Sequence, residues 1–228
     1  MSAAPYAQRH EEHFEPEYGL PERLPDSEHK LWQGSPEWRL LARTVFHWNK
    51  LALYFGVILL WRVAALLSDG ASMSEVLGAM VRLVPLFAIG LGLLGLLAWL
   101  TARTTVYTLT DRRVVLRVGI VLTVTYNLPL RSIDAAHVHT LKDGHGEIAL
   151  ALKPGTRIAY LHLWPHVRPW HFAATQPMMR CLADVQPLAD RLALAWSQAN
   201  QQSAQPAAAT ADDVGSAASL NQPVLARL

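Results

Sequence analysis

The sequence predicts an α+β membrane protein, in which a two-helix transmembrane hairpin is followed by a cytoplasmic antiparallel β-barrel with a C-terminal helix. Two long apolar stretches within residues 51–100 and a β-rich run that begins at Thr104 support this architecture. Of the 228 residues, 51% are hydrophobic and only 17% are charged, whereas soluble domains carry roughly 25% charged residues. A formal charge of +2, with no run of five basic residues, gives no reason to expect a nucleic acid partner.

The second apolar stretch, from Leu83 to Leu100, contains 18 residues without a charge. As an α-helix it would span about 27 Å, close to the thickness of a bilayer core. We therefore predict a transmembrane helix over about 83–102, with Pro85 in its first turn, where a missing N–H matters little. Ala88 and Gly92 stand four residues apart, a spacing that permits close helix packing and hence a homodimer.

The first apolar stretch, from Leu51 to Leu67, predicts the other helix over about 46–67 and is interrupted by Arg62. An arginine at the centre of a membrane helix costs roughly 2.5–3.5 kcal/mol. Arg62 lies near the far end, next to Trp61, so its side chain can reach the interface. We favour an interfacial anchor over a functional intramembrane charge.

Basic residues flank the hairpin and are scarce between the helices, where one basic residue stands beside Asp69 and Glu75. Because short cytoplasmic loops are rich in Lys and Arg, we expect a multi-pass membrane protein with both termini in the cytoplasm. The flanking residues are Lys30, Arg39, Arg43 and Lys50 before the helices and Arg103, Arg112, Arg113 and Arg117 after them.

The rest of the chain divides by composition. Residues 1–27 are polar and broken by proline, which predicts a flexible lead, and residues 28–50 contain the strand-like piece LWQGSPEW. Residues 104–198 are expected to form one domain that ends in a helix over about 187–198. Residues 199–228 lack periodicity, which predicts a disordered tail.

Six β-rich segments follow one another with turn signals between them. Consecutive strands with short turns predict an antiparallel meander, most economically a small barrel or sandwich. The expected strands are TVYTLT, RVVLRVGIVL, TVTYNLPL, SIDAAHVHTL, GEIALALK and TRIAYLHLW.

The segment Tyr107-x-Leu109-Thr110-Asp111-Arg112-Arg113-Val114-Val115-x-Arg117-x-Gly119, directly after the hairpin, resembles the bacterial pleckstrin-homology-like (PH-like) domain. In that family a strand, a tight turn and a second strand open the barrel just after the membrane helices. The piece LWQGSPEW also looks like the N-terminal strand of that family. The resemblance implies a PH-like domain over residues 104–198.

A second resemblance is more specific, and it covers about residues 20–198. The run Leu163-Trp164-Pro165-His166-Val167-Arg168-Pro169-Trp170, followed by Gln176-Pro177-Met178-Met179-Arg180, is similar to the PuhB family of photosynthetic complex assembly proteins of purple phototrophic bacteria. It implies a non-enzymatic factor of the inner or intracytoplasmic membrane, without a cofactor. Such a factor would assist assembly of the reaction centre and, through it, of the core light-harvesting complex, so the implied partners are subunits of both.

The ten histidines raise the question of a metal or pigment site. His137 and His139 share one face of a strand, and His162 and His166 stand four apart, but a zinc site needs three or four converging ligands. No H-E-x-x-H, P-loop or nucleophile-elbow motif is present. We therefore expect ordinary surface or turn histidines, a small buried Cys181, no metal and no enzymatic activity.

The run from Trp164 to Trp170 is the main candidate for partner binding. Its two prolines remove backbone donors, and tryptophan and arginine are enriched at interfaces. Alternatively, the two tryptophans plug the open end of the barrel or touch the lipid headgroups. The candidate residues are Trp164, Pro165, His166, Arg168, Pro169 and Trp170.

Arg112 and Arg113, at the first turn of the barrel, are candidates for contact with lipid headgroups, each contributing about 1 kcal/mol near an anionic surface. Cytoplasmic segments next to membrane helices are generally rich in Lys and Arg, which accounts for these two arginines without a bound lipid. The alternative function is therefore a general bacterial PH-like membrane protein that binds lipid or organises the envelope.

Overall fold

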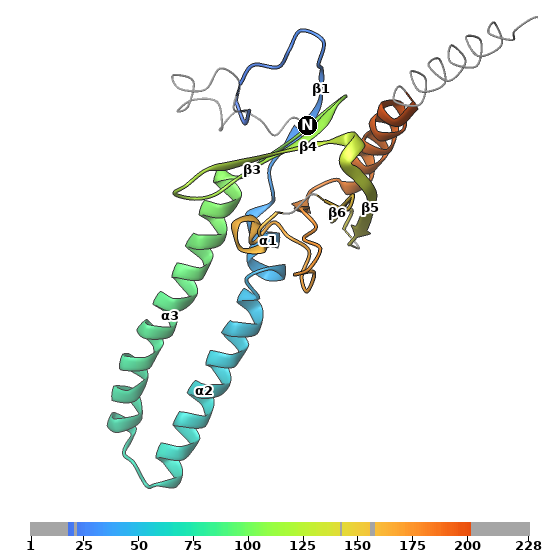
Figure 1. Cartoon of the computed structure of the whole chain (residues 1–228). Coiled ribbons are helices and arrows are strands. Elements are labelled where there is room, and N and C mark those ends of the chain that lie inside the picture. The colour runs from blue at the N-terminus through green and yellow to red at the C-terminus, as the bar shows by residue number, and fades with distance from the viewer. Residues whose placement is uncertain (1–17, 21, 142, 156–157, 202–228) are drawn as a thin grey trace, which may run out of the picture.

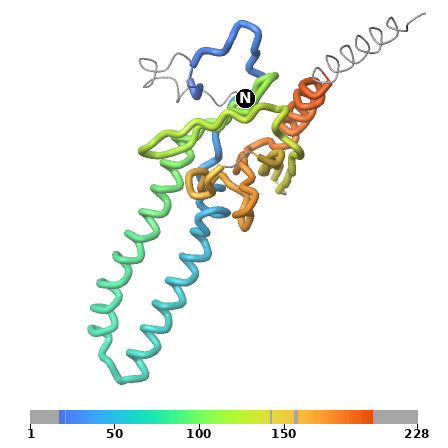
Figure 2. The backbone as a smooth tube through the Cα atoms, in the orientation of Figure 1, coloured from blue at the N-terminus to red at the C-terminus, as the bar shows by residue number. Residues whose placement is uncertain are grey.

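A long two-helix hairpin projects from a β-rich part in which two sheets and a helix pack together (Figure 1). The computed structural model describes residues 18–20, 22–141, 143–155 and 158–201, so most of the expected lead and most of the expected tail lie outside the described residues. The tube in Figure 2 shows that the chain runs along the β-rich part before it enters the hairpin, and returns to the same end afterwards.

The elements follow one another in the order that the sequence predicts, and the described residues add three short helices: α1, the 3-10 helix η1 and α4. A helix over residues 185–201 ends the described part of the chain. The other elements are β1 (Lys30–Gly34), α1 (Trp38–Thr44), α2 (Trp48–Ser68), α3 (Met73–Thr104), β2 (Val106–Thr110), β3 (Arg113–Val118), β4 (Val124–Pro129), η1 (Leu130–Ser132), β5 (Ile133–Thr140), β6 (Gly146–Leu152), α4 (Tyr160–Leu163) and β7 (Met178–Leu182).

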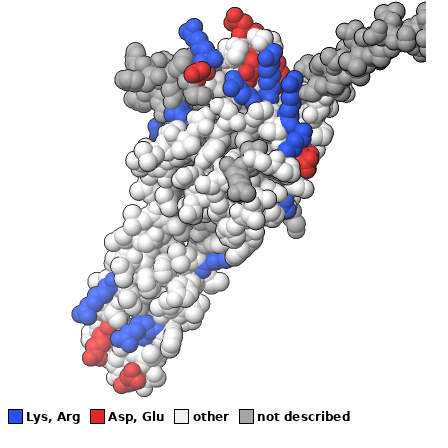
Figure 3. Space-filling view, viewed as in Figure 1, with Lys and Arg blue, Asp and Glu red and all other residues white. Residues whose placement is uncertain are grey.

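The hairpin helices α2 and α3 are long and apolar enough to cross a bilayer. No residue of α2 is buried, and large apolar side chains such as Leu60 and Trp61 are 71% and 74% exposed. A core helix of a soluble domain would bury such side chains. Figure 3 shows charged residues at the tip of the hairpin and over the sheets, with a largely uncharged band between.

Helix α3 begins at Met73, so the expectation that it starts near residue 83 with Pro85 in its first turn is wrong. A capping box starts the helix: the Ser72 side chain and the Glu75 carboxylate satisfy backbone N–H groups of the first turn. Pro85 lies inside the helix. Phe55 of α2 stacks on Phe87 of α3, with the ring centroids 4.4 Å apart.

The strands form two antiparallel sheets and are not closed into a barrel. The first sheet has the order β1-β2-β3-β4 and the second has the order β5-β6-β7. Strand β1 precedes the hairpin and β2 follows it, yet they are neighbours, with Gln33 opposite Thr108. The two ends of the hairpin are therefore held together by a strand pair.

The core lies between the two sheets and the helix over residues 185–201. Leu109 and Leu116 of the first sheet, Ile148 of the second sheet and Leu188 of the helix are at most 1% exposed and belong to one cluster. Trp196 of the same helix donates a hydrogen bond from Nε1 to the carbonyl of Ile133, at 3.0 Å. The expected C-terminal helix is therefore present and packs on the sheets. It continues to residue 201, beyond the expected end at 198.

The sixth expected strand, TRIAYLHLW, is not a strand in its described residues. Tyr160–Leu163 forms the short helix α4, and β7 instead comes from Met178–Leu182. Ile148 and Ala149 of β6 lie opposite Met179 and Met178 of β7. The alternation of apolar residues in TRIAYLHLW is too short to separate a strand from a single helical turn.

A smaller cluster joins the β-rich part to the hairpin. Leu41 of α1, Ala102 of α3 and Cys181 of β7 are buried against one another. The Cys181 carbonyl accepts a hydrogen bond of 2.8 Å from the N–H of Glu37. Glu37 is the N-cap residue of α1. Helix α1 therefore connects the sheets to the end of α3.

Candidate functional site

The candidate loop, residues 164–170, is anchored through the buried side chain of His166. The His166 Nδ1 lies 2.6 Å from the Tyr107 hydroxyl, and its Nε2 lies 3.0 Å from the Thr105 hydroxyl. All three residues are at most 1% exposed. A neutral imidazole has one donor and one acceptor nitrogen, so both nitrogens are satisfied by the two hydroxyls.

Burial keeps this histidine neutral. Burial, followed by the positive charge of Arg180, lowers the pKa of His166 to about 3. Burial also raises the pKa of Tyr107 well above its ordinary value. At neutral pH the pair is an uncharged hydrogen-bonded unit, which suits a structural anchor better than acid–base chemistry.

Arg180 of β7 ties the loop to the second sheet. Its Nε donates to the Glu147 carboxylate at 3.0 Å, and its Nη1 donates to the Pro165 carbonyl at 3.2 Å. The Arg180 backbone N–H donates to the Tyr107 hydroxyl at 3.2 Å. One arginine therefore links β6, the loop and β2.

The far end of the loop is closed by a second polar contact. Arg168 donates from Nη1 to the Gln176 side-chain oxygen at 2.9 Å, and its backbone N–H donates to the Gln176 carbonyl at 3.0 Å. Val167 forms an isolated antiparallel bridge with Pro177. The segment between residues 168 and 176 is therefore held at both of its ends by these contacts.

Aromatic side chains occupy the exposed part of the loop. Trp170 is 85% exposed and Phe172 is 62% exposed, and their rings meet edge to face with centroids 6.3 Å apart. Tyr160 of α4 lies against Phe172 at 4.6 Å. We call Tyr160, Trp170 and Phe172 the aromatic surface. Trp170 has a φ of 65°, a left-handed conformation that is costly for a bulky residue unless its surroundings enforce it.

Trp164 faces the hairpin. It is 52% exposed, and its ring meets that of Phe46, in the turn between α1 and α2, at 5.8 Å. A cavity of about 240 Å³ separates Trp164 from α3 and the β3–β4 turn. Val121 and Leu122 in that turn are 89% and 82% exposed. Trp164 therefore lies where the hairpin meets the β-rich part.

The six residues expected to bind a partner separate into two groups. Pro165 and His166 are buried and anchor the loop, and Arg168 is half-buried. Trp164, Pro169 and Trp170 are exposed. The structure adds Phe172 to the exposed group, with the half-buried Tyr160 packed against it, and no local sequence pattern linked either residue to Trp170.

The two arginines expected at lipid headgroups are in different environments. Arg113 forms a bidentate ion pair with Glu28. Its Nε donates to Oε1 and its Nη2 donates to Oε2, each at 2.8 Å. Burial raises the pKa of Glu28, but hydrogen bonds from Arg113 and Thr110 outweigh it and leave the pKa below its ordinary value. Arg112 is exposed. Only Arg112 therefore presents its side chain freely to a headgroup.

The histidines and Cys181 are the remaining candidates for metal binding or catalysis. His137, His139 and His162 are exposed, whereas His166 is buried, so the expectation of surface or turn histidines is wrong for His166. Within the described residues, no group of three His, Cys, Asp or Glu side chains could hold a metal ion. Cys181 is fully buried, as expected, and burial raises its pKa to about 11.

The sequence of this chain is similar to those of known proteins. Residues 51–195 match the family described as "Bacterial PH domain". A protein of Rhodobacter capsulatus described as "Uncharacterized 23.7 kDa protein in puhA 5'region" is 37% identical over 196 residues, which cover 84% of this chain and 88% of the relative. No solved structure matches the chain. The family match includes both hairpin helices, the two sheets except β1, and most of the last helix.

Proposed function

The chain belongs to the bacterial PH domain family, and from this premise we propose that it is a non-enzymatic, membrane-bound assembly factor for the photosynthetic reaction centre. It acts by protein–protein contacts and thereby also affects the core light-harvesting complex. The observation that carries the proposal is the exposed aromatic surface on a rigid base: Trp170 is 85% exposed, while His166 beneath the loop is 1% exposed. Exposed aromatic anchors on a preformed loop are typical of protein interfaces.

The location printed for the relative supports a link with photosynthesis. That protein is described by its position in the puhA 5' region of a phototroph. The resemblance of residues 163–180 to photosynthetic complex assembly proteins points in the same direction. Within the described residues, the site offers buried, mutually satisfied polar groups rather than a convergent set of reactive ones, which favours binding over catalysis.

We place the hairpin across the bacterial inner or intracytoplasmic membrane. The charge-free stretch of α3 between Arg82 and Arg103 has a length of about 30 Å as a helix, which matches a bilayer core. Because β1 pairs with β2, the chain returns to the side from which it entered. The basic residues on both flanks favour the cytoplasm for that side.

The loop that carries Trp164 and Trp170 then lies close to the membrane. Trp164 contacts Phe46 next to the start of α2, so the loop sits at the level where the hairpin leaves the bilayer. A partner that is itself embedded in the membrane, such as a reaction-centre subunit, can reach this surface while it is being assembled.

The proposal is tested by complementing a deletion strain of the phototrophic host. Wild-type protein should restore reaction-centre absorbance, whereas Trp170→Ala/Phe172→Ala, present at equal level, should restore it poorly. Leu194→Ala is the control, because Leu194 is 63% exposed on the last helix, outside the aromatic surface. Normal reaction-centre content in the deletion strain would overturn the proposal. An envelope defect without loss of reaction centres would favour a general envelope role.

The partner is identified by photocrosslinking. A crosslinking amino acid at position 170 should capture a reaction-centre or core light-harvesting polypeptide during complex synthesis, and the same residue at position 194 should not. Capture of the same products from both positions would contradict a specific contact through the aromatic surface.

A further inference from the structure

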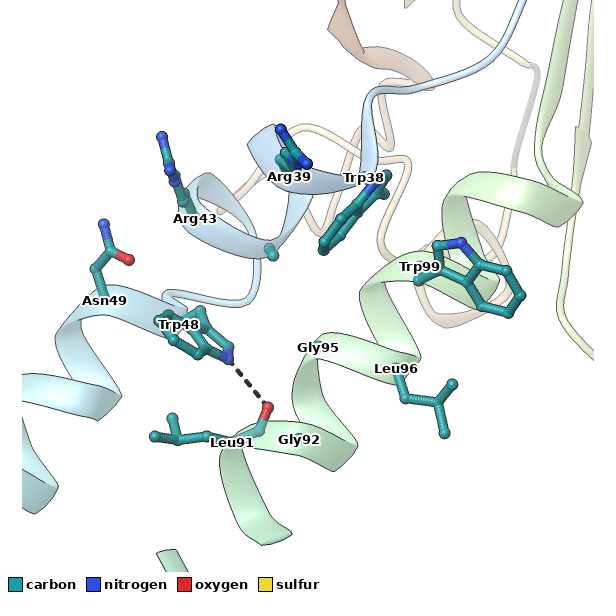
Figure 4. A pocket seen from close by; sticks show the side chains of 11 residues that line it. Trp38, Arg39, Arg43, Trp48, Asn49, Leu91, Gly92, Gly95, Leu96 and Trp99 are labelled. Atoms are coloured by element: carbon teal, nitrogen blue, oxygen red, sulfur yellow. Dashed lines mark hydrogen bonds between the residues drawn. The ribbon is translucent and has the colours of Figure 1, made fainter. Parts of the chain in front are cut away.

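A second surface feature lies on the hairpin, outside the site described above. A cavity of about 540 Å³ opens between α1, the first turn of α2 and the C-terminal half of α3 (Figure 4). Trp38 of α1 and Trp48 of α2 lie on either side of it, and Gly92 and Gly95 of α3 form its floor. We call this cavity the hairpin groove.

The floor of the hairpin groove is apolar and open. A Cβ atom at Gly92 would meet no atom within 4 Å, and one at Gly95 would meet only the Trp48 Nε1 at 3.8 Å. That indole nitrogen is already satisfied, because it donates to the Leu91 carbonyl at 3.0 Å. The floor thus has room for an extended apolar chain and presents no free donor to it.

The rim of the groove is positively charged. Arg39 and Arg43 stand one turn apart on α1, and Figure 4 shows both side chains directed away from the floor. The Arg39 guanidinium lies 5.5 Å from the centre of the Trp38 ring. Neither arginine has an ion-pair partner in the part of the chain that the structure describes. The adjacent carboxylate, Glu37, is held by His145 at 2.8 Å.

A cationic rim above an apolar channel complements an anionic amphiphile. Arginine recognises phosphate oxygens through several N–H donors at once. Tryptophans are enriched at the depth of lipid headgroups, where Trp38, Trp48 and Trp99 would lie if the hairpin spans the bilayer. A partner helix packed on Gly92 and Gly95 would leave two cations beside it without a counter-charge.

We propose that the hairpin groove binds one anionic phospholipid, with its phosphate on Arg39 and Arg43 and an acyl chain between Trp38 and Trp48 over Gly92 and Gly95. This inference rests on the proposed membrane placement but not on the proposed role in assembly. The bound lipid fills the space between α1 and α3 and so stabilises the position of α1, which also carries the contact with Cys181.

The test uses the full-length protein, purified from its membrane in mild detergent, with mass spectrometric quantification of the phosphatidylglycerol and phosphatidylethanolamine that accompany it. We expect phosphatidylglycerol to be enriched over its share of the membrane. Arg39→Gln/Arg43→Gln should lower this enrichment by about fivefold for each arginine, and Arg39→Lys/Arg43→Lys should keep most of it. The matched control is Arg23→Gln/Arg131→Gln, which also removes two exposed arginines. Arg23 lies in the segment before β1 and Arg131 lies in η1, so both are outside the hairpin groove.

A second variant fills the floor and leaves the charges unchanged. Gly92→Leu should reduce the enrichment as strongly as the double arginine variant, because the side chain occupies the path of the acyl chain. Absence of enrichment in the wild type, or an equal loss in the Arg23/Arg131 control, would overturn the proposal. So would a Gly92→Leu protein that keeps its phosphatidylglycerol enrichment, because the acyl chain would then not lie over Gly92. Reaction-centre content in the complemented strain is scored separately, so failure of the assembly role is distinguishable from failure of the lipid site.

Discussion

The Nδ1 atom of His166 lies 2.6 Å from the hydroxyl oxygen of Tyr107, and this contact joins the candidate partner-binding loop to the first strand after the hairpin. The other ring nitrogen contacts Thr105, the C-cap residue directly after α3. The position of the loop is therefore set by the end of the helix and by the start of the sheet together. We therefore expect a change at Thr105 or Tyr107 to affect the position of the loop.

His166 should make the stability of the protein depend on pH. In the unfolded chain this imidazole binds a proton below about 6.5, whereas in the folded protein it stays neutral down to about 3. Folded stability is therefore complete above pH 6.5 and falls as the pH drops, by at most about 1.4 kcal/mol per pH unit. Thermal unfolding of the full-length protein in detergent measures this slope between pH 6.5 and 4.5, above the range in which Glu28, with its lowered pKa, titrates.

His166→Gln should abolish this part of the slope, because an amide keeps hydrogen-bonding capacity but does not titrate in that range. His139→Gln is the control, since His139 is exposed. An unchanged slope in His166→Gln would show that other groups cause the pH dependence.

Tyr107→Phe should destabilise the protein by about 1–3 kcal/mol, because it leaves a buried imidazole nitrogen and the Arg180 N–H without a partner. The matched control is Tyr126→Phe, on the half-buried strand β4, with an expected effect within about 0.5 kcal/mol. Chemical unfolding followed by tryptophan fluorescence compares the two variants. Equal effects would mean that the Tyr107 hydroxyl contributes no specific hydrogen bond.

Glu28→Gln should loosen β1. It removes the charge that pairs with Arg113, whose side chain is 31% exposed, so solvent screens part of the interaction and we expect a loss of about 1–3 kcal/mol. Hydrogen exchange of the amides in Lys30–Gly34 should become faster, because Glu28 lies two residues before this edge strand. Glu22→Gln, an exposed carboxylate, is the control. Unchanged exchange in β1 would contradict a role of the ion pair in holding the strand.

The proposed topology is tested by cysteine labelling. The native Cys181 is fully buried and its raised pKa leaves little thiolate, so a membrane-impermeant maleimide should not modify it. Asp69→Cys, in the turn between α2 and α3, should be labelled in intact spheroplasts. His139→Cys, on the exposed face of β5, should be labelled only after the membrane is opened. Labelling of His139→Cys from outside would reverse the topology.

Much of the fold is local in origin and could be predicted from the sequence. The two charge-poor apolar stretches and the first five β-rich segments correspond to α2, α3 and the strands β2–β6. Hydropathy alone places the start of α3 ten residues too late, whereas Ser72 and Glu75 form a capping box, which is a sequence signal for a helix start. With that signal, the ten residues before Leu83 belong to the helix.

The candidate site was harder to predict, because its geometry depends on contacts between distant residues. Tyr107 and His166 are 59 positions apart, and Glu28 and Arg113 are 85 apart. Nothing within the loop itself distinguishes the buried His166 from the exposed Trp170. Composition identified the loop, but only the fold separates the residues that hold it from those that can meet a partner.

The pairing of Lys30 with Thr110 spans 80 residues, and the whole hairpin lies between them. During synthesis, the edge strand leaves the ribosome first and has no neighbour for its backbone hydrogen bonds until both apolar helices have been made. Completion of the first sheet is therefore conditional on a finished hairpin whose ends have met. In the proposed membrane placement, a chain in which one helix fails to insert would keep an unpaired strand, which is the kind of surface that quality-control proteases and chaperones detect.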